Sequence, residues 1–256
     1  NGYPSKKEYQ DALNNNTQNE KLKALLEYLP QNHAGAYASY FNLAKSGIEE
    51  PMTTHADHYN TNFAYSTDAY SKGEVFMEQL GYITGAAVRD QILLDYYDKW
   101  KFKHPTANDL IRLAEKRSGM KLDWYKEYWV NSTKTIDYAI DSLWESGKET
   151  MIRIKRIGLM PMPVDVQLTF ADGTKELHYV PLDLQYGVKP VEDSTIQRKV
   201  YTPWNWTHAT YTITTTKKLA TVTLVDIDPS QRLADIDRKN NQLKLDWSTP
   251  TPVTVQ

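Results

Sequence analysis

The chain has 256 residues, a mass of 29.6 kDa, 30 basic and 32 acidic side chains, and a formal net charge of -2. This length suits one large domain or two small ones, and the near-neutral charge excludes the basic excess that nucleic-acid binding requires. No apolar run approaches the ~20 residues that cross a bilayer, and the absence of cysteine excludes disulfides, thiolate metal ligands and cysteine nucleophiles.

Residues 1–134 are predicted to be helical, because apolar and aromatic side chains recur there at three- and four-residue intervals. Thr106 and Asp109 have the spacing of a helix N-cap and its third position, and Gly119 is a helix stop signal. The aromatic residues of this part are expected to pack mainly in a core between helices. The predicted helices are residues 20–29, 36–45, 66–81, 85–100, 107–118 and 123–131.

Residues 135–256 change to short runs of alternating Thr, Val and Ile, which predict strands. Asp172 and Gly173 lie between two such runs and predict a hairpin. About seven short strands predict an antiparallel β-sandwich of the immunoglobulin or fibronectin kind. A polar tail begins at Pro229, and its end, residues 249–256, is expected to be extended. The predicted class is therefore α+β. The predicted strands are residues 138–143, 151–157, 164–170, 175–180, 199–206, 209–215 and 219–225.

Histidine offers few candidates for metal chemistry. None of the six histidines forms an HExxH motif, and His55 and His58 are the only close pair. With Asp57 they could bind a metal ion, but no third partner can be read from the sequence. A role in a polar loop or at the rim of a substrate site is therefore favoured. The chain also contains no G-x-S-x-G, P-loop or G-x-G-x-x-G motif.

The most informative stretch is residues 65–73. Tyr65 and Tyr70 lie five positions apart, and the second tyrosine begins the run Tyr-Ser-Lys-Gly before an apolar helix. Further short motifs lie before and after this stretch. They are Ala36–Pro51, Lys101–Pro105, Thr106–Asp109, Ser118–Trp124, Trp129 and Asp137–Tyr138.

In their order and spacing these motifs resemble the gluzincin zinc aminopeptidases, the family of aminopeptidase N and leukotriene hydrolase. Each motif alone is weakly specific. The resemblance covers the part of a thermolysin-like catalytic domain that follows the zinc-binding helices, and continues into the β-sandwich domain after it. It implies an all-α C-terminal part of that catalytic domain in residues 1–134 and the sandwich in residues 135–256.

The resemblance also implies roles for individual residues. Tyr70 matches the tyrosine whose phenol donates a hydrogen bond to the oxyanion of the tetrahedral intermediate, a task for which a neutral phenol is suited. Tyr65 matches a second active-site tyrosine that helps to position substrate, and His55 and His58 are assigned to the substrate rim. Lys72 and Gly73 are expected to be structural, with Gly73 allowing close packing where the helix begins.

The departure from the family is large, because the zinc-binding histidines, the following glutamate ligand and the general-base glutamate do not occur in this sequence. The expectation is therefore a C-terminal portion of a longer zinc peptidase. The upstream catalytic half of the same polypeptide would hold the Zn²⁺, and the present chain alone would bind no catalytic zinc and be inactive. The expected substrate is a peptide, with no nucleic acid involved, and the resemblance suggests a periplasmic or extracellular location.

An alternative stays open at this point. The same fold could be a non-catalytic binding or structural module for a peptide, a protein or a glycan. In that case Trp204 and Trp206 could form an exposed aromatic platform, although an alternating strand with one buried face is the favoured interpretation of this segment.

Overall fold

The computed structural model describes residues 6–14 and 28–247. They form two compact units, so each is described by itself. The helical unit contains Asn1–Thr135 and Ser230–Ile236, and the sheet unit contains Ile136–Pro229 and Asp237–Gln256. Helices in one unit and sheets in the other confirm the predicted α+β class. Within the described ranges no helix is long and apolar enough to cross a membrane.

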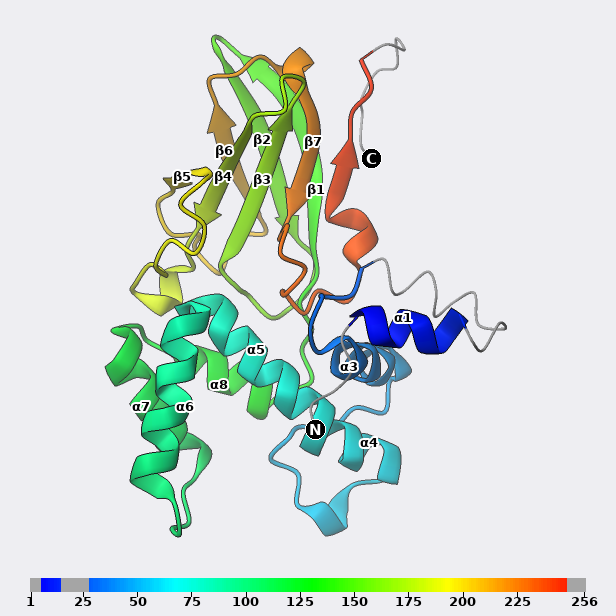
Figure 1. The fold of residues 1–256 in the computed structure, drawn as a ribbon, viewed down its shortest axis with the longest axis vertical. Helices are drawn as coiled ribbons and strands as arrows, with labels where there is room; N and C mark the ends of the chain where they lie inside the picture. The colour runs from blue at the N-terminus through cyan, green and yellow to red at the C-terminus, as the bar shows by residue number, and fades with distance from the viewer. Residues whose placement is uncertain (1–5, 15–27, 248–256) are drawn as a thin grey trace. The chain divides into compact units, whose positions relative to one another are not determined.

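The helical unit follows the predicted pattern with two differences (Figure 1). The prediction for residues 20–29 falls mostly outside the described residues, and the first helix was not predicted. The single helix predicted for residues 66–81 consists of three segments, the middle one a wide π-helical turn. The elements are α1 (Lys6–Asn14), α3 (Ala34–Ser46), η1 (Ala56–His58), α4 (Asn62–Ser66), η2 (Thr67–Lys72), α5 (Gly73–Thr84), α6 (Ala86–Trp100), α7 (Ala107–Ser118) and α8 (Asp123–Val130).

Both predicted boundaries of α7 are confirmed. The backbone N–H of Thr106 donates to the Asp109 carboxylate at 2.8 Å, which satisfies a donor that the helix itself leaves unpaired. At the other end Gly119 adopts a left-handed conformation with φ of 71°, which a residue with a side chain enters at a cost.

The core of the helical unit is strongly aromatic, as expected. Tyr125 is fully buried, stacks on Phe76 with ring centroids 4.9 Å apart, and donates its hydroxyl hydrogen to the Phe76 carbonyl oxygen. Trp129 packs against Tyr40 at 5.4 Å. Buried aromatic rings of this size remove large apolar areas from water, so these contacts account for much of the hydrophobic stabilisation of the unit.

One segment of the predicted sandwich domain belongs instead to the helical unit. Residues 230–236 lie in the predicted polar tail of the sandwich domain, but Leu233 and Ala234 are completely buried. The end of the tail that is predicted to be extended, residues 249–256, lies outside the described residues. Gln79, on α5, holds this segment by its backbone: its amide nitrogen donates to the Arg232 oxygen at 2.6 Å, and its amide oxygen accepts from the Ala234 N–H at 3.1 Å. Leu233 and Ala234 are only two adjacent apolar residues, so hydrophobic periodicity could not predict that this segment belongs to the helical unit.

The sheet unit contains two sheets, and the predicted Asp172–Gly173 hairpin joins β3 to β4. Among the described residues every strand pair is antiparallel except β4–β5, and this parallel pair corrects the prediction of a wholly antiparallel sandwich. Strand β8 was not predicted, and the predicted strands 199–206 and 219–225 each form only in part. One sheet has the order β1 (Tyr138–Ser146), β2 (Glu149–Arg156), β6 (Thr210–Thr215), and the other β5 (Gln197–Val200), β4 (Lys175–Val180), β3 (Val164–Phe170), β7 (Val222–Ile227), β8 (Gln242–Lys244).

The buried Gln79 amide gives the first testable prediction. Gln79→Leu removes the acceptor of the Ala234 N–H, and an orphaned buried donor costs about 1–3 kcal/mol, whereas the Arg232 oxygen keeps its hydrogen bond from the Tyr37 hydroxyl. We expect a clear decrease in the free energy of unfolding, measured by urea denaturation. Gln91→Leu, the same change at an exposed position of α6, is the control and should leave stability nearly unchanged. Equal effects of the two substitutions would contradict this assignment.

Candidate functional site

Tyr70 lies on the π-helical turn η2 and is strongly exposed, with 67% of its surface accessible. It is therefore neither a core tyrosine nor a capping residue. The turn has an unusual arrangement of side chains, because its buried residues are all polar and its outward residues are Ala69 and Tyr70. The buried residues are Thr67, Asp68, Ser71 and Lys72.

A buried ionic cluster lies beneath this turn. The Lys72 ammonium is 2.7 Å from a carboxylate oxygen of Glu49 and 3.8 Å from a carboxylate oxygen of Asp68. It also donates to the backbone oxygen of Ser132 at 3.5 Å. Glu49 lies in the segment between α3 and η1, and Ser132 follows α8, so Lys72 connects three distant parts of the helical unit. We call Glu49, Asp68 and Lys72 the lysine cluster.

The lysine cluster holds two carboxyl groups against one ammonium, and burial changes their titration. Burial raises the pKa of Asp68 to about 6, although the nearby Lys72 ammonium acts in the opposite direction. Burial likewise raises the pKa of Glu49, again opposed by Lys72. Two neighbouring tyrosines, Tyr40 and Tyr59, also have raised pKa values, to about 12 for Tyr59, mainly because they are desolvated. Burial therefore disfavours the ionised forms of the two carboxyl groups.

The other predicted site residues lie on the chain just before Tyr70. Tyr65, on α4, is 37% exposed and packs edge-on against the Tyr59 ring at 5.5 Å. His55 precedes the short η1 turn, and His58 is its last residue. Both histidines are exposed, and their ring centroids lie 5.3 Å apart. The structure thus pairs the two histidines and pairs Tyr65 with Tyr59. Among the described residues no hydrogen bond or ring contact joins Tyr70 to any of these three.

The described residues were also compared with the ligand sets that bind zinc. In the described ranges no group of three His, Asp or Glu side chains is arranged to hold a metal ion. His55 and His58 are exposed and close together, but two histidines are fewer than the three or four protein ligands of a zinc site.

The expectation for Gly73 is wrong, whereas that for Lys72 agrees with its burial. A Cβ atom on Gly73 would lie 3.8 Å from the nearest backbone oxygen, an ordinary contact, so close packing does not require glycine there. The missed residues are Asp68 and Glu49. The spacing of Asp68 and Lys72, four positions apart, could have indicated an ion pair on one helical face. Glu49 lies 23 positions away from Lys72, beyond any local pattern.

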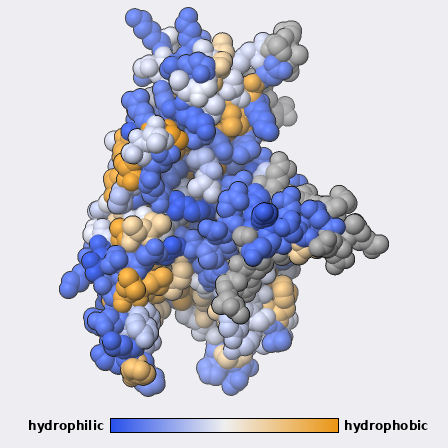
Figure 2. Space-filling model, viewed as in Figure 1, coloured by the Kyte–Doolittle hydropathy of each residue, from blue (hydrophilic) through white to orange (hydrophobic). Residues whose placement is uncertain are grey.

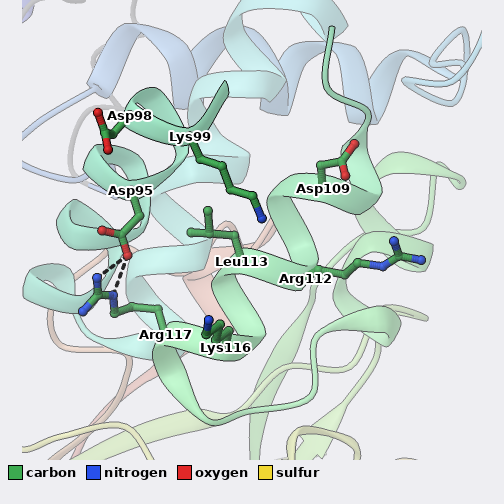
Figure 3. A pocket seen from close by; sticks show the side chains of 8 residues that line it. All are labelled: Asp95, Asp98, Lys99, Asp109, Arg112, Leu113, Lys116 and Arg117. Carbon is green, nitrogen blue, oxygen red and sulfur yellow. Dashed lines mark hydrogen bonds and ion pairs between the residues drawn. The ribbon is translucent and has the colours of Figure 1, made fainter. Parts of the chain in front are cut away.

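A separate hollow lies elsewhere on the helical unit. A groove of about 700 Å³ opens between α6 and α7, and charged side chains from both helices line it (Figure 3). The groove is lined by nearly equal numbers of basic and acidic side chains, and Arg117 forms an ion pair with Asp95 within it. None of its lining residues is a predicted site residue. On the face drawn in Figure 2, hydrophobic side chains occur as separate patches within a mainly hydrophilic surface, as is normal for a protein surface.

Comparisons with protein-family models and with curated proteins give no match to this chain. The candidate site therefore depends on the placement of its own residues: Tyr70 exposed on a wide turn, and the lysine cluster buried beneath it.

Removing the ammonium should strongly destabilise the helical unit. Lys72→Met leaves Glu49 and Asp68 buried without their cation, and breaking a buried ion pair in this way typically costs about 3–5 kcal/mol. Urea denaturation followed by circular dichroism measures the loss. The control is Lys101→Met, which breaks the exposed pair with Asp98 and should cost at most about 1 kcal/mol. If Lys72→Met lowers the free energy of unfolding as little as Lys101→Met does, the assignment of a buried ion-pair cluster is contradicted.

The raised pKa of Asp68 predicts a pH dependence of stability. Because the folded state binds this proton more tightly than the unfolded state, the stabilising contribution is complete below pH 4 and is lost as the pH rises through about 6. Asp68→Asn removes this titration, so its free energy of unfolding should decrease less than that of the wild type between pH 4 and 7. Asp98→Asn, at an exposed carboxylate, is the control. Parallel curves for wild type and Asp68→Asn would contradict the prediction.

Proposed function

We propose that the helical unit forms part of the active site of a zinc-dependent peptidase, with Tyr70 as the residue that stabilises the oxyanion. In this proposal the unit is the C-terminal part of a thermolysin-like catalytic domain, and the sheet unit is the immunoglobulin-like domain that follows it. The zinc ligands would come from residues outside this sequence, which supply the metal chemistry. The substrate is a peptide.

The observation that supports this role is the exposure of Tyr70 on a turn whose other side is held by buried charges. When a peptide carbonyl becomes tetrahedral, negative charge develops on its oxygen. A phenol O–H fixed in advance at that position donates a hydrogen bond that is stronger in the transition state than in the ground state. Since the donor is uncharged, it need not lose a proton to act.

Tyr65 has a supporting role in the proposal. Its ring is half-exposed and held edge-on by Tyr59, so it offers an apolar surface beside a polar hydroxyl. Such a side chain suits contact with the substrate rather than with the reacting atoms. His55 and His58 are both exposed at the preceding turn. We assign them to the rim of the substrate site, where they can donate hydrogen bonds to a peptide or accept them from it.

The alternative of a glycan-binding aromatic platform has less support. Trp204 is buried, donates its indole N–H to the His208 oxygen at 3.0 Å, and packs against Tyr138. Only Trp206 of the pair is exposed. The two tryptophans therefore do not form a common exposed surface.

Substitution of Tyr70 tests the proposed function in the whole protein that carries this sequence. Tyr70→Phe removes only the donor, so kcat for peptide hydrolysis should fall by about 10²–10³ while KM changes little. The matched control is Tyr97→Phe, because Tyr97 is equally exposed on the same unit, at 68%, and should retain full activity.

Two results would contradict the proposal. One is a Tyr70→Phe enzyme with undiminished kcat. The other is a whole protein that has no HExxH motif upstream of Asn1 and hydrolyses no peptide, in which case a binding or structural module would be the better description.

A further inference from the structure

The turn that carries Tyr70 buries no apolar residue of its own. Its buried residues are Thr67, Asp68, Ser71 and Lys72, so it lacks the apolar inner face of an ordinary amphipathic helix. A π-helical turn is also rare and local, and it persists only where the surroundings favour it. The interactions beneath the turn must therefore supply its geometry.

Lys72 makes those interactions. It ends the π-helical turn, its side chain is almost completely buried, and its ammonium contacts Glu49, Asp68 and the Ser132 oxygen. These partners come from the segment before η1, from the turn itself and from the end of α8. An ammonium held from three directions fixes the end of the turn only two residues after Tyr70.

We propose that Lys72 is a positioning residue, whose ammonium, held by Glu49 and Asp68, sets the direction in which the turn presents the Tyr70 phenol. The proposal rests on the function proposed above and adds the residues that make Tyr70 effective. An oxyanion donor must be held within about 0.5 Å of its productive position, and a misplacement of about 1 Å can cost 10²-fold in rate. Lys72 does not contact the reacting atoms, and it acts through Tyr70.

Lys72→Arg is the informative substitution, because it keeps the positive charge and avoids the unpaired carboxylates of Lys72→Met. A planar guanidinium cannot occupy the compact site of an ammonium without moving its neighbours. In the whole protein that carries this sequence, we expect kcat to fall at least 10-fold with KM little changed. Lys101→Arg, in the exposed pair with Asp98, is the control and should be neutral.

A double-mutant cycle distinguishes positioning from a merely structural role. If Lys72 acts through the Tyr70 hydroxyl, Lys72→Arg should cost little further rate once Tyr70→Phe has removed that hydroxyl. Independent effects that multiply would overturn the proposal while leaving the proposed function of Tyr70 intact. Glu49→Gln provides a second variant of the same cluster and should show the same non-additivity.

Hydrogen exchange supplies a readout that does not need activity. Lys72→Arg should accelerate amide exchange in residues 67–73 at least 10-fold, with exchange in α6 and α7 unchanged. If the whole protein hydrolyses no peptide, the proposed function fails, and this measurement alone decides whether Lys72 fixes the turn. Unchanged exchange in residues 67–73 would overturn the positioning role.

Discussion

The candidate site depends on the ion pairs that the Lys72 ammonium forms with Glu49 and Asp68. The ammonium is buried with two carboxyl groups, one of them 2.7 Å away, and it joins three segments of the helical unit. An ion pair of this kind contributes little net stability compared with a well-packed apolar core, since desolvation of the charges offsets their attraction. Its value lies in geometry, because an unpaired charge at this depth is costly and the ammonium must therefore stay close to its carboxylate partners.

The polar interior of the turn follows from the same constraint. Four polar side chains of the turn are buried while Tyr70 is exposed, so one short turn carries both an exposed phenol and two buried charged side chains. Gln79 in α5 has a similar role, because its buried amide forms hydrogen bonds with two backbone groups of segment 230–236. In both places a polar side chain connects parts of the chain that the sequence separates widely, and hydrogen-bond geometry determines how they meet.

Local signals predicted much of the fold, and non-local contacts explain the differences. The N-cap of α7 and its glycine stop depend on residues within one turn, so they could be read directly from the sequence. The hairpin at Asp172–Gly173 is equally local. The parallel pairing of β4 with β5, the π-helical turn and the return of residues 230–236 depend on partners far along the chain, which periodicity does not report. For the same reason Tyr70 could be proposed from a local motif, whereas Glu49 could not, because its ion pair is with Lys72, 23 positions away.

The most direct test of this account is a structure of the whole protein that carries this sequence, bound to a peptide analogue with a tetrahedral phosphinate in place of the scissile carbonyl. The account predicts that the Tyr70 hydroxyl lies within about 2.5–3.0 Å of a phosphinate oxygen, with Lys72 still held by Glu49 and Asp68 beneath the turn. A Tyr70 side chain directed into solvent, away from the bound phosphinate, would contradict it.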